Sequence, residues 1–314
     1  MKNQHNQSRR RFLQVMALGA TAGMSGTIRP AFAQAGTGTF ITKSIPSSLE
    51  RIPAIGLGSS RTFNVGNDPR GLDNVTEVMR HFFNTGGTLI DSSPMYGSAQ
   101  AAICYGLNKL GKTNDVFAAD KVWTWEAENG PAQMEQSRQY WQIDAFDLMQ
   151  VHNLVAWEQH LKTLYRMKEQ GEIRYVGITT SHGRQHEELE HVMKTQPLDF
   201  VQLSYNILDR EAEKRLLPLA RERGIAVIIN RPFQRGELID ELQGKPLPEW
   251  AKTIDCKTWP QFLLKFVIAH PAVTCAITAT SQVEHVKENM AACFSPLPDE
   301  AMRTRMIEHV EKML

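Results

Sequence analysis

Four polar residues in three segments of the chain have the types that acid catalysis at a carbonyl group requires. They are Asp91, Tyr96, Lys121 and His152. This chemistry needs a general acid, a cation that lowers the pKa of that acid, a carboxylate that holds the cation, and a polar group that orients the substrate oxygen. The sequence therefore predicts a site that protonates a carbonyl oxygen as a hydride arrives.

Tyr96 is the candidate acid, and its partners follow from its chemistry. The unperturbed pKa of tyrosine is about 10, so an acid that works near neutral pH needs a shift of up to ~3 units, worth ~4 kcal/mol. Two unit charges about 4 Å apart interact by about 4 kcal/mol at an effective dielectric of ~20, so Lys121 beside Tyr96 has the right magnitude. A buried Lys121 keeps its charge only with a carboxylate such as Asp91.

Each of these residues also has a purely structural interpretation. A tyrosine in a loop such as Asp91 to Gly97 most often packs half-buried, and a histidine at the end of a strand, such as His152, often bonds only to backbone. Ten histidines in the chain give many chances for coincidence. The joint presence of all four types in order favours the functional interpretation.

Short apolar runs alternate with amphipathic stretches along the chain after residue 33. Eight runs are rich in β-branched or apolar residues and predict strands: Ala54 to Gly58, Thr88 to Asp91, Val116 to Lys121, Phe146 to Val151, Arg174 to Thr179, Phe200 to Leu203, Ala226 to Ile229 and Val273 to Ile277. Apolar spacings of three and four predict helices between them: Leu72 to Asn84, Met134 to Trp141, Trp157 to Glu169, Glu211 to Arg223 and Val283 to Ala292.

This alternation predicts an α/β fold, a single (β/α)₈ barrel, rather than an open doubly wound sheet. No glycine-rich dinucleotide fingerprint follows the first strand. The active site of such a barrel lies at the carboxyl ends of its strands, where Asp91, Lys121 and His152 are predicted to lie. We also expect a hairpin that closes the barrel floor within residues 40–53, a long covering loop over 233–258, and an outer helix over 298–314.

The first 33 residues indicate export. They carry five cations, no acid, and a mildly apolar stretch rich in Ala and Gly. Ser8 to Gln14 resembles a twin-arginine export signal, and Ala31-Phe32-Ala33 has the form of a signal peptidase site. We predict cleavage after Ala33, folded export by the twin-arginine translocation machinery, and a periplasmic location. A basic tail followed by a membrane anchor is the alternative.

The predicted organisation is thus a signal peptide over 1–33 and a barrel over 34–314. Without the leader the chain carries 30 Lys and Arg against 34 Asp and Glu, a net charge of −4 that gives no reason to expect nucleic acid as a partner. No run of 18 apolar residues follows residue 33, so we expect a mature form that does not span a membrane. The scattered Cys104, Cys256, Cys275 and Cys293 form no metal motif, and we expect them buried and unpaired.

Beyond the leader, nearly the whole chain resembles the aldo-keto reductase family. Asp91 to Gly97 looks like that family's Asp-x-x-x-x-Tyr-Gly signature, Lys121-Val122-Trp123 like its Lys-x-Trp, and Gln150-Val151-His152 like its histidine at a strand end. The resemblance implies a carbonyl reductase that needs no metal. In it Tyr96 is the general acid, Lys121 and Asp91 tune the acid, His152 orients the carbonyl and Trp123 lines the substrate pocket.

The resemblance also implies a nicotinamide dinucleotide across the barrel mouth. Its contacts would come from Thr179, Thr180, Gln202, Asn230, Arg231, Thr280, Ser281, Glu288 and Asn289. Arg231 would meet the pyrophosphate or form a structural ion pair. The cations that hold the 2′-phosphate in members specific for NADP are absent from Thr278 to His285. NADP(H) is therefore implied by the family, and NAD(H) stays open.

Three functions remain to be compared. The first is an exported NAD(P)-dependent aldo-keto reductase that acts on a small carbonyl or alcohol substrate. The second is a periplasmic binding or accessory barrel that has lost catalysis, which would need no set of Tyr, Lys and Asp. The third is a hydrolase with paired carboxylates, for which no second acid stands at a convincing strand end, so it ranks last.

Overall fold

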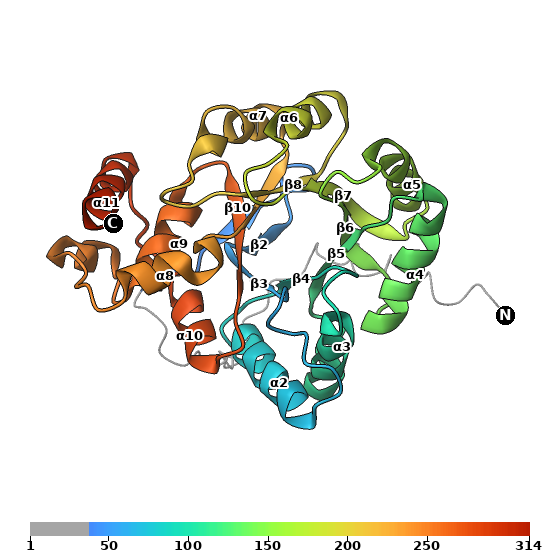
Figure 1. The fold of residues 1–314 in the computed structure, drawn as a ribbon, viewed down its shortest axis with the longest axis horizontal. Coiled ribbons are helices and arrows are strands. Elements are labelled where there is room, and N and C mark those ends of the chain that lie inside the picture. Colours follow the sequence, from blue (N-terminus) through green and yellow to red (C-terminus); the bar gives the residue numbers. More distant parts are fainter. Residues whose placement is uncertain (1–37) are drawn as a thin grey trace, which may run out of the picture. The chain divides into compact units, whose positions relative to one another are not determined.

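The computed structural model describes residues 38–314, and Figure 1 shows their arrangement. The expected signal peptide, with its twin-arginine signature and its cleavage site after Ala33, lies outside the described residues.

Eight parallel strands form a closed barrel in which each strand pairs with the next along the chain and the last pairs with the first. They are β3 (Ile55–Gly58), β4 (Leu89–Asp91), β5 (Phe117–Val122), β6 (Phe146–His152), β7 (Ile173–Thr179), β8 (Phe200–Ser204), β9 (Ala226–Asn230) and β10 (Val273–Ala279). All eight predicted strands are present, and the predicted (β/α)₈ barrel is confirmed.

Helices surround the barrel (Figure 1). They are α2 (Pro69–Asn84), α3 (Ala99–Leu110), α4 (Gly130–Trp141), α5 (Trp157–Glu169), α6 (His186–Thr195), α7 (Leu216–Arg223), α8 (Glu237–Leu242), α9 (Trp259–Ala269), α10 (Val283–Ala291) and α11 (Glu300–Met313). Shorter 3₁₀ turns are η1 (Ala127–Asn129), η2 (Glu211–Glu213), η3 (Gln234–Gly236) and η4 (Glu249–Ile254). The helices' apolar faces and the outer faces of the strands share one large buried cluster.

The barrel floor is closed by the predicted hairpin, which consists of β1 (Thr42–Ser44) and β2 (Arg51–Pro53). Ile45 and Ile52 of this hairpin are buried in the same cluster as inward-facing barrel residues such as Phe117 and Phe200. Burying these side chains removes the apolar lower interior from water and stabilises the floor. At the opposite end of the barrel, β4 ends at Asp91 and β6 ends at His152, so the polar side chains of the candidate site lie there.

Three helices differ from the sequence prediction at their first residues. α4 begins at Gly130 rather than Met134, with Pro131 in its first turn. α2 begins at Pro69 rather than Leu72, because the Asp68 carboxylate caps it by accepting from the Gly71 N–H at 2.9 Å and proline suits the first turn. The predicted helix from Glu211 is split into η2 and α7. Pro218 has no N–H and its ring would clash with the carbonyl four residues earlier, so it can stand only in the first turn of α7.

The segment 233–258, predicted as a long loop, instead contains η3, α8 and η4. Leu238 and Leu242, four residues apart, are both buried, and so are Ala251 and Ile254, three apart. These spacings bury one face of each short helix. The apolar spacing typical of a helix was therefore present in the sequence, but a single repeat of it is too short to predict a helix. The segment is folded onto the barrel rather than irregular.

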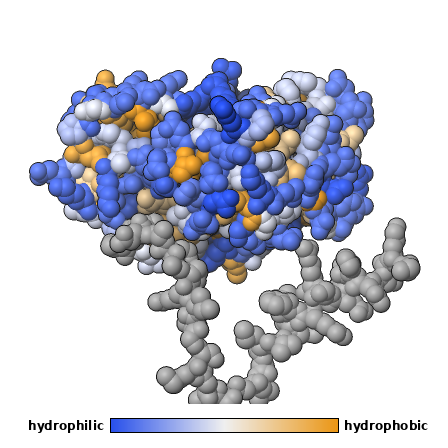
Figure 2. Space-filling model, turned by 90° about the horizontal axis from the view of Figure 1, so that it is seen from below, coloured by the Kyte–Doolittle hydropathy of each residue, from blue (hydrophilic) through white to orange (hydrophobic). Residues whose placement is uncertain are grey.

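The tail forms the predicted outer helix α11, which buries Met306 and Val310. All four cysteines are buried and free, as expected. None of the helices within residues 38–314 is both long enough and apolar enough to cross a membrane. Figure 2 shows one face of the described residues, where hydrophobic side chains lie scattered among hydrophilic ones.

Candidate active site

Asp91 and Lys121 form a buried ion pair at the carboxyl ends of β4 and β5. Lys121 Nζ lies 2.6 Å from Asp91 Oδ2, and their side chains are 0 % and 3 % exposed. The same ammonium donates to the Ser92 carbonyl at 2.6 Å, while Gln202 and Gln150 donate to Asp91 Oδ1 at 2.9 and 3.3 Å. Burial lowers the pKa of Lys121, but the charge and hydrogen bond of Asp91 together with the charges of Tyr96 and Asp120 outweigh it. The net direction is upward, so Lys121 stays protonated.

Tyr96 lies in the loop after β4, above this ion pair. Lys121 Nζ is 5.3 Å from the centre of the Tyr96 ring, and the ring meets His152 edge-on with 6.0 Å between centroids. Burial raises the pKa of the Tyr96 hydroxyl, and the opposing charge of Lys121 does not overcome it. This net direction is opposite to the one expected from the sequence, because desolvation of the phenolate outweighs the ammonium. Tyr96 is therefore a phenol at neutral pH, ready to donate its proton.

His152, the last residue of β6, is neutral. Burial and the positive charge of Lys121 lower the pKa of its imidazole to about 3. Its Nδ1 lies 2.9 Å from Ser93 Oγ, which also accepts from the Met95 N–H at 3.4 Å. The hydroxyl hydrogen of Ser93 can point to Nδ1, and in the tautomer that accepts it the imidazole proton lies on Nε2 as a donor. Sequence reasoning missed Ser93, although it lies inside the signature segment.

Trp123 stands beside this group at the barrel mouth, 37 % exposed, with its ring centroid 6.5 Å from that of His152. Its backbone is fixed on both sides by Gln133, which accepts from Trp123 N at 2.6 Å and donates to Trp123 O at 2.8 Å. Trp125 nearby in the chain is 74 % exposed. The position of Trp123 suits the wall of a substrate pocket.

Four of the residues predicted to hold a cofactor form a connected polar group on β8 and at the carboxyl ends of β7 and β9. Thr179 pairs with Gln202, and the Thr180 N–H donates to the Gln202 carbonyl at 2.9 Å. Asn230 Nδ2 donates to the Thr180 carbonyl at 2.9 Å and to Gln202 Oε1 at 3.4 Å. Since Gln202 also donates to Asp91, this group is continuous with the buried ion pair.

Arg231 belongs to a cluster of cations in the loops after β3, β7 and β9. It contacts His182 Nε2, to which Arg235 also donates at 3.0 Å. Burial and the charges of Arg235, Arg61 and Arg184 lower the pKa of Arg231 to about 10, with Glu237 acting in the opposite direction. The predicted alternative, an ion pair, is absent: no carboxylate among residues 38–314 lies within 4.0 Å of Arg231. Cations held together without a carboxylate suit a polyanion such as a pyrophosphate.

The remaining predicted cofactor residues lie after β10. Thr280 Oγ1 accepts from the Gln282 N–H at 3.0 Å, and the Ser281 carbonyl accepts from Asn74 at 2.6 Å. Glu288 and Asn289 lie on α10, the first half-buried and the second buried. Lys287, the nearest cation on that helix, is paired with Glu284 at 2.6 Å. No cation here is placed to replace the missing partners of a 2′-phosphate.

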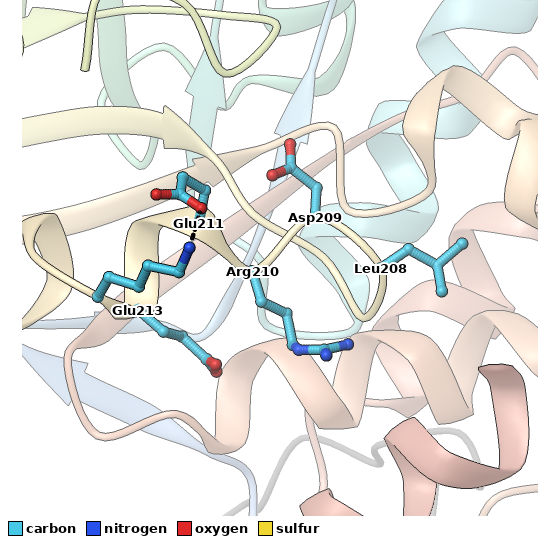
Figure 3. A pocket seen from close by; sticks show the side chains of 6 residues that line it. Leu208, Asp209, Arg210, Glu211 and Glu213 are labelled. Atoms are coloured by element: carbon cyan, nitrogen blue, oxygen red, sulfur yellow. Dashed lines mark hydrogen bonds and ion pairs between the residues drawn. The ribbon is translucent and has the colours of Figure 1, made fainter.

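Two cavities lie away from these residues. One, of about 480 Å³, is lined by residues 208–211, 213 and 214 in the segment after β8. Figure 3 shows Glu211 among these side chains, and Glu211 pairs with Lys214. Another, of about 710 Å³, lies between α4 and α5. No group of three or more potential metal ligands occurs among the described residues.

The chain is similar to known proteins over most of its described residues. A model of the aldo/keto reductase family matches residues 54–307. The methylglyoxal reductase YeaE of Escherichia coli is 27% identical over 245 residues, which cover 76% of this chain and 85% of that protein. The aldo-keto reductase YhdN of Bacillus subtilis is 28% identical over 182 residues, covering 53% and 54%.

Solved structures show the same fold. An aldo/keto reductase from Klebsiella pneumoniae in complex with NADP and acetate superposes with a TM-score of 0.73 at 23% identity, covering 85% of this chain and 94% of that one. The holo form of aldo-keto reductase AKR11C1 from Bacillus halodurans gives 0.71 at 20% identity, covering 88% and 96%.

Proposed function

Because the chain belongs to the aldo/keto reductase family and is therefore an NAD(P)-dependent oxidoreductase, we propose that Tyr96 is the general acid in its reduction of a carbonyl substrate. The observation that carries this proposal is the buried pair of Lys121 and Asp91, which lies beside the Tyr96 ring. Burying the Lys121 ammonium costs desolvation free energy. Beside a phenol this cation has a catalytic role, because it stabilises the phenolate that remains after proton donation.

The residues divide the reaction between them. A bound nicotinamide supplies the hydride to the carbonyl carbon. His152 donates a hydrogen bond from Nε2 to the carbonyl oxygen and polarises it. Tyr96 gives its proton to that oxygen as negative charge develops there, and Lys121 stabilises the tyrosinate. Oxidation of an alcohol uses the same groups in reverse.

The cofactor follows from the donor sets of this chain and from its relatives. The cluster of Arg231, Arg235 and His182 fits a pyrophosphate, and Gln202 with Asn230 offers amides to a nicotinamide carboxamide. The similar structure from Klebsiella pneumoniae contains NADP, so we propose NADP(H). Each missing contact to the 2′-phosphate removes about 1.5 to 3 kcal/mol from the binding free energy of NADP(H). The protein should therefore prefer NADP(H) over NAD(H) only weakly.

The substrate is a small carbonyl compound. The similarity to a methylglyoxal reductase makes methylglyoxal the first probe, and the exposed Trp123 makes benzaldehyde the second. An aromatic wall packs against either apolar or aromatic groups next to the carbonyl.

We also propose that the protein is exported folded by the twin-arginine route and works in the periplasm. The support is the sequence of the first 33 residues, with its consecutive arginines and its Ala-Phe-Ala site. A dinucleotide site assembled from the ends of four strands, β7 to β10, requires folding before export, which this route permits. The test is cell fractionation of the unchanged chain and of the variant with Arg9→Lys and Arg10→Lys. Export of both forms would refute the proposal.

Turnover of the Tyr96→Phe variant tests the catalytic proposal. We expect kcat for methylglyoxal with NADPH to fall roughly 10²- to 10⁴-fold, with NADPH affinity unchanged within a few fold. Tyr105→Phe is the matched control, since Tyr105 lies on the surface of α3 and bonds to Asp73. Unchanged turnover in Tyr96→Phe would exclude Tyr96 as the acid. Failure of the unchanged protein to bind NADPH or NADH would favour the catalytically silent binding barrel.

A further inference from the structure

Asp120 is a second buried carboxylate next to the candidate site, and the sequence pattern gave no reason to single it out. It precedes Lys121 in β5 and has no exposed surface. Because successive strand residues face opposite sides, Lys121 points into the barrel while Asp120 points outward, toward α3 and α4. The two charges therefore lie on the two faces of one strand.

All the hydrogen-bond partners of Asp120 are donors. Its Oδ2 accepts from Gln100 Nε2 and from Trp141 Nε1, both at 2.8 Å, and its Oδ1 accepts from the Lys121 N–H at 2.7 Å. No acceptor for an acid proton is found among these partners, so the site is built for the carboxylate. Burial nevertheless raises the pKa of Asp120 to about 7.

A purely structural role is a poor explanation for this residue. The side-chain oxygen of an asparagine would accept from Gln100 and Trp141 without the cost of removing a carboxylate from water. Asp120 also connects α3 and β5, the elements whose relative position sets the distance between Tyr96 and Lys121. Gln100 lies in the first turn of α3, four residues after Tyr96, and it donates to Ser137 of α4 at 2.8 Å. The Asp120 carboxylate thus joins the helix that follows Tyr96 to the strand that carries Lys121.

We propose that Asp120 is a positioning residue and a second counter-charge for the pair of Lys121 and Tyr96, an inference that rests on the proposed function. Its hydrogen bonds hold α3, and with it the loop of Tyr96, against β5. Its negative charge favours the ammonium of Lys121 and the phenol of Tyr96. The charged groups near it are Lys121 on its own strand and Asp91 on β4, while α3 and α4 contribute only neutral partners.

The test is the pH dependence of kcat in the full-length protein, measured with NADPH and methylglyoxal. Asp120→Asn removes one negative charge, so Tyr96 and Lys121 both lose their protons more easily. The basic limb of carbonyl reduction should then move to lower pH. Looser positioning should also lower kcat roughly tenfold, with NADPH affinity unchanged.

Asp147→Asn is the matched control. Asp147 lies on β6 and also accepts a backbone N–H of β5, from Ala118 at 2.8 Å, but it stands near the barrel floor and pairs with Arg174. This variant should lose stability without moving the pH profile. If Asp120→Asn behaves in the same way, Asp120 is an ordinary structural residue and the inference is wrong.

Trp141→Phe keeps the test decisive if Asp120→Asn does not fold. It removes one donor to Asp120 but keeps the charge, so the pKa of Asp120 rises further. As the pH is lowered, kcat should then begin to fall at a higher pH than in the unchanged protein. The basic limb of the pH profile should stay in place. A Trp141→Phe profile unchanged on both sides would overturn the inference. If neither the unchanged protein nor Asp120→Asn turns over methylglyoxal, the proposed function is wrong and the inference, which rests on it, is wrong too. Turnover by Asp120→Asn alone would contradict the inference directly, because Asp120 would then hinder the reaction.

Discussion

Replacing Lys121 by methionine is the sharpest perturbation of the buried ion pair. Methionine keeps most of the apolar stem and removes the ammonium. Two hydrogen bonds of 2.6 Å are lost, one to Asp91 Oδ2 and one to the Ser92 carbonyl. Asp91 would keep only the amides of Gln202 and Gln150 as donors, both on Oδ1.

The magnitudes follow from the distances. With the ring centre as the position of the charge, an ammonium 5.3 Å from tyrosinate stabilises it by about 3 kcal/mol at an effective dielectric of ~20. Loss of this interaction should lower kcat about 10²-fold. Leaving the buried Asp91 without its counter-charge should also destabilise the fold by about 3 to 5 kcal/mol.

The assay combines kcat for methylglyoxal, NADPH affinity and Tm for Lys121→Met and a matched control. Lys109→Met is that control, because Lys109 Nζ also lies 2.6 Å from a carboxylate, Asp73, and 5.3 Å from a tyrosine ring centre, Tyr105. That pair is solvent-exposed, with side chains 45% and 57% accessible. Water screens it, so kcat and Tm should hardly change.

A Lys121→Met variant that keeps kcat within about threefold of the unchanged protein would refute the role given to Lys121. A loss confined to NADPH affinity would refute it too, because it would make Lys121 a binding residue. A kcat loss in Lys109→Met as large as in Lys121→Met would show that the assay responds to general damage.

Three further predictions concern the neighbours of this pair. Ser93→Ala removes the hydroxyl that sets the tautomer of His152, and should lower kcat roughly fivefold for a hydrogen bond worth about 1 kcal/mol, measured in steady state. Arg231→Ala should weaken NADPH binding roughly 10- to 150-fold in a fluorescence titration, an effect of about 1.5 to 3 kcal/mol that shrinks in high salt. Because burial lowers the folded pKa of His152 to about 3, the unfolded chain binds the proton first, so this residue's contribution to stability is lost as pH falls from about 6.5 toward 3. His152→Gln should therefore show a shallower loss of Tm over that range.

Each prediction has a contrary outcome. An unchanged kcat in Ser93→Ala would mean that backbone packing alone sets the His152 tautomer. Arg231→Ala binding NADPH as tightly as Arg80→Ala, a surface control on α2 paired with Glu77, would remove Arg231 from the cofactor site. A Tm profile of His152→Gln parallel to that of the unchanged protein would show that folding does not lower the pKa of His152.

The barrel was predictable because its signal is repeated. Each strand from β3 to β10 is a short apolar run, and the placement of Asp91, Lys121 and His152 at or one residue before a strand end follows from those runs. Helix boundaries were less predictable where one residue decides them, as with the Asp68 cap and with Pro218 in α7. Short helices such as α8 bury only two or three residues, too few to give a clear period.

The site was predictable in its residue types but not in its electrostatics. Desolvation of Tyr96 raises its pKa by more than the charge of Lys121 lowers it. This balance depends on how deeply Tyr96 is buried, and the spacing of residues in the sequence does not reveal burial. Asp120 and Gln150 are strand residues whose partners come from other elements. The cationic cluster joins loops far apart in sequence, with His182 bound by Arg231 and Arg235. Only the folded chain brings these groups together.

A single-turnover experiment tests the central claim most directly. The purified protein is loaded with NADPH, its affinity is recorded by fluorescence, and methylglyoxal is added while the loss of NADPH fluorescence is followed. The account predicts rapid loss in the unchanged protein and persistent fluorescence in Tyr96→Phe at equal NADPH affinity. Equal decay in the two proteins, or no NADPH binding by the unchanged protein, would contradict it.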